Sequence, residues 1–487
     1  MFKRIICSIA VISMAAFSVC GCAAVSANTG IATFQEKVDE AMESSTEHTE
    51  EVINEGGNDF LENDTDGEHA ITADGNTAGY SNTKVIKSGE AEGDDADFYG
   101  ENSAIFATNG ATLTLSDMDI ETDGTHANAV FSYGEGTTVD ISDSVINTKG
   151  NCSGGLMTTG GGTMNAKNLD IHTTGNSSAA IRSDRGGGTV NVTGGTYTTD
   201  GKGSPVIYST ADITVSDAEL TSNASQGVVV EGKNSVTLND VKLTALNNTK
   251  NSDKSDYYQA VMIYQSMSGD ADEGLASFTM NGGSLNNKNG DIFFVNNTKA
   301  EISLKSADIT NEDKEGVFLR AAAAGWGNEG SNGGHVDMKA EKQVINGDML
   351  IDDVSSLNLY LKDSSEFSGA VNSEGEAGDV YVELSDGSKW TLTGDSYISS
   401  LTCDTDSIDL NGYKLYVNGE EYSEGTASSG EAIEVKIESN GQKGKQDKPG
   451  KPGDGNPPGG EKPDKPGNGN PPSGEKPSGP PPDGKEL

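Results

Sequence analysis

Apolar and polar residues alternate along most of the chain in short segments, and eight of these segments end on an apolar residue at nearly constant spacing. The eight residues are Ile120, Ile146, Ile171, Tyr197, Leu220, Leu243, Leu285 and Ile309. Successive members lie 26, 25, 26, 23, 23, 42 and 24 residues apart. One structural unit therefore repeats along the chain, with a single long insertion after Leu243.

Each repeat predicts one coil of a β-solenoid. In the consecutive repeats that begin at Gly110, Gly136 and Gly162, three short alternating stretches are separated by Gly, Asp, Asn, Ser and Thr. Period-two alternation is typical of a strand with one buried face, and those turn residues tolerate left-handed backbone. Because each strand finds its hydrogen-bond partners in the neighbouring coils, the coils must stack. We predict an all-β fold: a single-stranded right-handed parallel β-helix of roughly twelve coils with capped ends, flanked by disordered segments.

The repeat region divides the chain into five predicted segments. These are a signal peptide at residues 1–21, a lipid-anchored acidic linker at 22–68, an N-terminal cap of the solenoid at 69–102, the β-helix at 103–425 and a Pro/Gly/Lys-rich disordered tail at 426–487. Twelve of the thirteen prolines fall between Pro449 and Pro482, so we expect the tail to be extended and to lack a core. The tail is a stalk, a segment that contacts the cell wall, or a ligand for another protein.

The N-terminus predicts secretion. Two basic residues precede an apolar run from Ile5 to Val19, which is typical of a secretory signal and is short for a membrane span. Residues 19–22, VCGC, resemble the lipobox of bacterial lipoproteins, in which the chain is cut before a Cys that carries lipid. The resemblance implies lipidation at Cys22 and an extracellular protein anchored to the cell membrane at the bacterial cell surface. The alternative is cleavage after Ala27.

The formal net charge of the chain is −43. Such a surface repels nucleic acid and anionic membrane, and it can gather divalent cations. We therefore expect no nucleic-acid partner, and membrane contact only through an N-terminal lipid. Only Cys152 and Cys403 would remain as free cysteines in the mature chain. None of the five His residues falls in a metal-binding motif.

From Ser103 to Gly419 the chain resembles the pectate-lyase-like superfamily of right-handed β-helices, including adhesin-like and carbohydrate-binding β-helix proteins of bacterial surfaces. The resemblance rests on the repeat pattern and on no functional motif. It implies an extracellular binding protein or adhesin that recognises a polysaccharide or another surface polymer on one face, with calcium as the one candidate cofactor. Because this fold also carries enzymes, a calcium-dependent polysaccharide lyase and a purely structural surface rod remain alternatives.

The third strand of each coil supplies the candidate binding residues. An inward apolar residue in each of these strands is followed by an outward one, which predicts an exposed column of Phe106, Phe131, Met157, Arg182, Tyr208, Glu231, Tyr264, Asn296 and Arg320. Aromatic faces stack on the C–H faces of sugars, and polar groups bind their hydroxyls. The candidate ligand-binding residues are Phe106, Phe131, Tyr133, Arg182, Tyr208, Glu231, Tyr264, Arg320 and Trp326. The alternative is that these rings only stabilise the strand ladder.

Chemistry beyond binding has few candidates. Arg182 and Asp184 form the one cluster that is similar to the arginine and acidic calcium site of a polysaccharide lyase, and its alternative is a surface ion pair. The paired-carboxylate motifs of polygalacturonases are missing, which favours binding over catalysis. The candidate calcium ligands lie in acidic loops and are Asp94, Asp95, Asp97, Asp270 and Asp272. The alternative for these loops is a solvated surface without metal.

Overall fold

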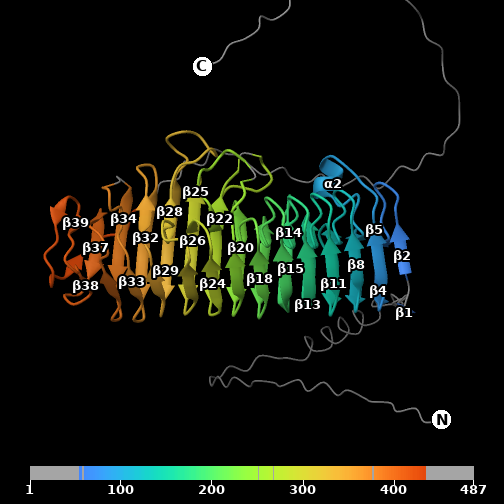
Figure 1. The fold of residues 1–487 in the computed structure, drawn as a ribbon, viewed down its shortest axis with the longest axis horizontal. Helices are drawn as coiled ribbons and strands as arrows, with labels where there is room; N and C mark the ends of the chain where they lie inside the picture. Colours follow the sequence, from blue (N-terminus) through green and yellow to red (C-terminus); the bar gives the residue numbers. More distant parts are fainter. Residues whose placement is uncertain (1–53, 57–59, 251, 267, 376–377, 435–487) are drawn as a thin grey trace, which may run out of the picture. The chain divides into compact units, whose positions relative to one another are not determined.

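The computed structural model describes residues 54–434, except 57–59, 251, 267 and 376–377. The predicted signal peptide, Cys22, most of the linker and almost all of the tail lie outside this part of the chain. The described part is nearly all β, with long parallel sheets that stack along one axis, as in a parallel β-solenoid (Figure 1). Within it, α2 (Asp94–Phe98) is the only helix, and no helix is long and apolar enough to span a membrane.

Parallel strands stack in three ladders. The first contains β1 (Asn54–Gly56), β4 (Thr77–Ser81), β7 (Thr112–Ser116), β10 (Thr138–Ser142), β13 (Gly162–Thr173), β15 (Gly188–Thr199), β17 (Asp212–Ser216), β20 (Ser235–Asn239), β23 (Leu275–Asn281), β26 (Thr298–Lys305), β29 (Gly334–Glu341), β32 (Ser356–Lys362), β34 (Asp379–Leu384) and β37 (Ser400–Cys403).

The second ladder shares the long strands β13 and β15 with the first. Its other strands are β2 (Phe60–Asn63), β5 (Lys84–Lys87), β8 (Asp119–Thr122), β11 (Val145–Thr148), β18 (Glu219–Ser222), β21 (Lys242–Ala245), β24 (Ser284–Asn287) and β27 (Asp308–Asn311). A separate four-stranded sheet contains β30 (Val344–Asn346), β33 (Glu366–Ser368), β35 (Lys389–Thr391) and β38 (Ile408–Asp409).

The third ladder is an 11-stranded sheet and carries the candidate site. It contains β3 (Ile71–Asp74), β6 (Ile105–Thr108), β9 (Val130–Tyr133), β12 (Leu156–Thr159), β14 (Ile181–Ser183), β16 (Ile207–Ser209), β19 (Val228–Glu231), β22 (Gln259–Tyr264), β25 (Asp291–Asn296), β28 (Leu319–Ala321) and β31 (Met349–Ile351). Near the C-terminal end, antiparallel pairs join β37 with β41 (Ser428–Ser429), and β39 (Leu415–Val417) with β40 (Glu420–Glu421), while β36 (Ser396–Ile398) pairs with β39.

The periodic apolar column of the sequence is confirmed as a physical stack. Ile120 pairs with Ile146, Ile146 with Ile171, and the column continues without a break to Ile309. All eight side chains are buried in one continuous core. Stacking therefore buries the inward face that a single coil would leave in water.

The ladders begin earlier than the sequence predicted. Strands β1 and β2 fall in the predicted linker, and β3, β4 and β5 fall in the predicted cap, yet all five pair in parallel with strands of the next repeat. These strands are short and lie among acidic and Gly-rich turns, so their alternation is hard to recognise without their partners. Part of the predicted linker and part of the predicted cap therefore belong to the ladders.

Candidate functional site

The outer face of the third ladder does not carry one aromatic column. Tyr208 pairs with Val229, and the same row continues through Met262 and Phe294 to Arg320. Glu231, Tyr264 and Asn296 form a second row, two residues further along their strands. Both rows lie on the outer face, because a two-residue shift keeps the face, but the predicted placement in one row was wrong. The predicted exposure of Glu231 and Asn296 was also wrong, since both are buried.

The N-terminal part of this face is covered by the segment that contains α2 (Figure 1). Phe131 and Met157 are fully buried, so the prediction of exposed side chains at these two positions was wrong. Phe106 is half-buried between Phe131, at 5.9 Å between ring centroids, and Tyr133, at 6.4 Å. Tyr99 follows α2 and contacts Tyr133 edge to face at 5.8 Å. This aromatic group packs α2 against the coils.

A cleft of about 520 Å³ lies further along the same face. Its floor comes from β16, β19 and β22, and its walls come from residues 247–250, 252–258, 266 and 268–270 and from the loop that holds Trp326. Two of these loops meet, since the backbone N–H of Gly325 donates to the carbonyl of Lys254 at 2.6 Å. The loops lie on the same edge of the stack as α2 (Figure 1).

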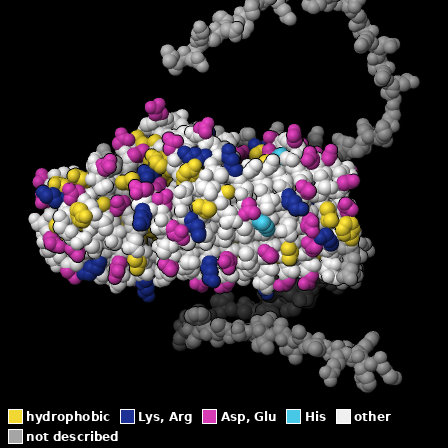
Figure 2. All heavy atoms as spheres, in the orientation of Figure 1, with side chains coloured by type: hydrophobic (Ala, Val, Ile, Leu, Met, Phe, Trp, Pro, Cys, Tyr) yellow, Lys and Arg dark blue, Asp and Glu magenta, His cyan; other side chains and the backbone are white. Residues whose placement is uncertain are grey.

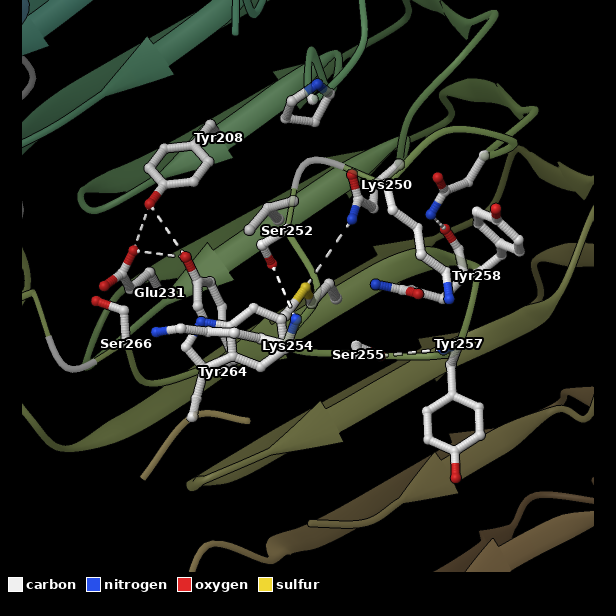
Figure 3. A pocket seen from close by; sticks show the side chains of 18 of the residues that line it. Tyr208, Glu231, Lys250, Ser252, Lys254, Ser255, Tyr257, Tyr258, Tyr264 and Ser266 are labelled. Carbon is white, nitrogen blue, oxygen red and sulfur yellow. Dashed lines mark hydrogen bonds between the residues drawn. The ribbon is translucent and has the colours of Figure 1, made fainter. Parts of the chain in front are cut away.

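Three predicted residues converge inside the cleft. The hydroxyls of Tyr208 and Tyr264 both donate to Oε2 of Glu231, at 3.0 Å for Tyr264 (Figure 3). The two hydroxyl oxygens lie 3.4 Å apart. Glu231 is only 1% exposed, and its Oε1 has no hydrogen-bond partner among the described residues. The Ser266 side chain lies next to this carboxylate (Figure 3).

Burial controls the ionisation of this group. Loss of hydration raises the pKa of Glu231 above the ordinary range of a carboxyl, although the nearby hydroxyls of Ser266, Tyr208 and Tyr264 oppose the shift. The same burial, with the negative carboxylate alongside, raises the pKa of both tyrosines well above the ordinary value. The tyrosine hydroxyls therefore remain protonated donors at neutral pH. The environment of Glu231 disfavours the ionised form of its carboxyl group.

An apolar base and a basic rim complete the cleft. Val229 and Met262 are buried beneath it, and the half-buried Tyr264 and Trp326 rings meet edge to face at 5.2 Å between centroids. The ammonium of Lys254 lies 5.8 Å from the Trp326 ring centroid. Figure 3 shows Lys254 beside Tyr264, whereas the ring of Tyr257 points away from the tyrosine pair.

The predicted arginines have partners of their own. Arg182 donates to Asp184 at 2.8 Å, and Arg320 donates to Asp291 at 2.6 Å while its guanidinium lies over the Tyr257 ring. Both arginine side chains and both carboxylates are largely buried. A general base for a lyase must be free to take a proton, so this geometry favours the ion-pair alternative for Arg182.

The candidate calcium residues do not converge on one point. Arg185 donates to Asp94 at 3.0 Å and to Asp270 at 2.8 Å, which ties α2 to the loop after β22. Lys233 pairs with Asp272 at 2.7 Å. Asp95 is exposed. Figure 2 likewise shows lysines and arginines among acidic side chains over the visible face. This arrangement favours the alternative for these loops, a solvated surface without metal.

One cluster escaped the sequence analysis. Asp97, His126 and Cys152 place one donor atom each within 4.8 Å of one another. His126 Nε2 lies 2.6 Å from Asp97 Oδ1. His126 and Cys152 occupy the same turn position in neighbouring repeats, 26 residues apart, and that spacing is the signal that could have revealed the pair.

No protein-family model, curated protein or solved structure matches this chain.

Proposed function

We propose that the protein is a non-catalytic binding protein or adhesin that recognises a polysaccharide or another surface polymer in the cleft around Tyr208, Glu231 and Tyr264. One observation carries the proposal: an aromatic wall, two phenol hydroxyls and a buried carboxylate converge in a single cleft of about 520 Å³. A sugar ring presents apolar C–H faces and polar hydroxyls together. Trp326 and Tyr264 complement the faces, and Glu231 with its tyrosines complements the hydroxyls.

The lyase and the structural rod are weaker candidates. Arg182 is already bound to Asp184, and four of the five acidic loop residues, Asp94, Asp97, Asp270 and Asp272, pair with arginine, lysine or histidine. A structural rod would not need an open cleft in which aromatic rings surround a buried carboxyl group.

The experiment is a screen of plant, host and cell-wall polysaccharides, in calcium and in chelator, with product analysis on every positive. Trp326→Ala is the test variant, and Tyr416→Ala is its matched control. Tyr416 is half-buried and stacks on Tyr397 at 4.9 Å, outside the cleft. We expect binding without products, lost in Trp326→Ala alone. Unsaturated products would support the lyase, and the absence of affinity for every polymer would support the rod.

The wider architecture belongs to the same proposal. We infer a right-handed coil, because parallel strands joined by a crossover are right-handed in nearly all proteins. Roughly twelve coils, with capped ends, remain our prediction. The antiparallel β37–β41 and β39–β40 pairs support a C-terminal cap, since a reversed strand covers an open edge.

The proposed location is the bacterial cell surface, with a lipid on Cys22 and membrane contact through that lipid alone. The lipobox-like residues support this proposal, and metabolic labelling with a fatty acid tests it. Label should enter the wild-type chain and be absent from Cys22→Ala. Label that persists in Cys22→Ala would remove the anchor from the account.

A further inference from the structure

His126 and Cys152 occupy equivalent backbone positions in two neighbouring coils. The N–H of His126 donates to the carbonyl of Asn151 at 2.9 Å, and the N–H of Cys152 donates to the carbonyl of Asn176 at 2.8 Å. Both residues have a positive φ, 57° and 54°. Equivalent backbone one coil apart places equivalent side chains about 4.8 Å apart. The two side chains therefore leave the stack side by side.

Asp97 in α2 approaches the pair from the covering segment. Its Oδ1 lies 2.6 Å from His126 Nε2, and the donor atoms of Asp97, His126 and Cys152 all lie within 4.8 Å of one another. His126 is only 7% exposed, whereas Asp97 and Cys152 are half-buried. Three chemically different metal donors thus meet at one partly covered point.

The histidine is held in the orientation that metal ligands need. Its Nδ1 lies 2.7 Å from the carbonyl of Ala91. A carbonyl only accepts, so Nδ1 carries the proton in this hydrogen bond. Nε2 shares a proton with Asp97 and can donate an electron pair once a metal ion displaces that proton. A ligating histidine usually has its second nitrogen fixed by a carbonyl or carboxylate in this way.

We propose that Asp97, His126 and Cys152 bind a transition-metal ion, with Zn²⁺ as the ion that fits best. Thiolate, imidazole and carboxylate are the donor types that zinc prefers, whereas calcium requires oxygen donors throughout. Three protein ligands leave a fourth tetrahedral position for water or a small ligand. The site therefore replaces the calcium expected at Asp97 with a softer ion.

The surrounding charges permit a cation. Two arginines lie close enough to influence Asp97, but Arg182 is paired with Asp184, and Arg185 is paired with both Asp94 and Asp270. The bound ion would displace the proton that joins His126 to Asp97 and the thiol proton of Cys152, so binding releases protons. It would also fix α2 to the coils, since Asp97 comes from the covering segment and the other two ligands come from the stack.

Cobalt titration of the purified full chain tests the site, because a thiolate bound to Co²⁺ gives a charge-transfer band in the near ultraviolet. We expect one equivalent of Co²⁺ to bind with this band, and Zn²⁺ to displace it. Cys152→Ser should abolish the band, and Asp97→Asn and His126→Gln should each weaken binding about tenfold or more. Calorimetric titration with Zn²⁺ in two buffers should show proton release.

The chain provides matched controls for both ligand types. His172 forms the same kind of pair with Asp200, at 2.7 Å, but without a cysteine in the cluster, and Cys403 is a buried free cysteine elsewhere. His172→Gln and Cys403→Ser should bind cobalt as the wild type does. A band that persists in Cys152→Ser, a full chain without any band, or unchanged binding in Asp97→Asn with the fold intact by circular dichroism would overturn the proposal.

Discussion

Tyr197→Phe should stabilise the protein, because the Tyr197 hydroxyl is buried in the apolar column without a hydrogen-bond partner among the described residues. The neighbours above and below in the column are Ile171 and Leu220. Burial raises the pKa of Tyr197 through loss of hydration alone, which agrees with an unsolvated hydroxyl. An unsatisfied buried polar group costs about 1–3 kcal/mol, and phenylalanine removes that group while it keeps the ring.

The size of the effect sets the assay. Unfolding entropy is about 2.1 cal/mol/K per residue, so the roughly 370 described residues give about 0.8 kcal/mol/K and a rise in Tm of about 1–4 °C. Scanning calorimetry with a single transition resolves such a shift. Tyr381→Phe is the control, because Tyr381 is also buried, at 4% exposed, but its hydroxyl donates to Glu383 at 3.0 Å. A lower Tm for Tyr197→Phe, or an equal gain in both variants, would refute the reasoning.

Three further changes follow from the same structure. The raised pKa of Glu231 means that its protonated form favours folding. This contribution to stability is present below the ordinary pKa of about 4.5 and is lost as the pH rises through the raised pKa. Glu231→Gln should therefore raise Tm at pH 7 but not at pH 4. Equal shifts at both values would contradict that sign. Ile146→Ala should cost about 2–5 kcal/mol in denaturant unfolding, because it opens a cavity in the central column, and a loss below about 1 kcal/mol would contradict the packing. Arg185→Met should expose the α2 segment to protease, since it leaves Asp94 and Asp270 without their shared cation; unchanged cleavage would show that the aromatic contacts suffice.

The repeat was readable because burial imposes a strict period on the sequence. One apolar residue per coil must stack on its equivalent, and the column from Ile120 to Ile309 obeys this rule throughout. Exact pairing is less constrained, since a shift of two residues keeps an apolar residue inside. That freedom explains why Tyr208 pairs with Val229 and not with Glu231.

The site was only half predictable, because loops decide what the sheet exposes. Strand alternation identified Tyr208, Glu231 and Tyr264 as outward residues, and the structure brings their polar atoms together. It could not show that the α2 segment buries Phe131, since no local pattern links residues 88–103 to β9. The Asp97 contact with His126 is equally remote from any short motif.

The most direct test of the proposed function is the affinity of one polysaccharide for three chains: wild type, Trp326→Ala and Tyr416→Ala. Titration calorimetry on a polymer from the screen would measure it. Loss of a central aromatic contact is typically worth about 2 kcal/mol in binding, or roughly thirtyfold in Kd. We predict that loss in Trp326→Ala and wild-type affinity in Tyr416→Ala. Equal affinity in all three chains would place the binding surface elsewhere and contradict the account.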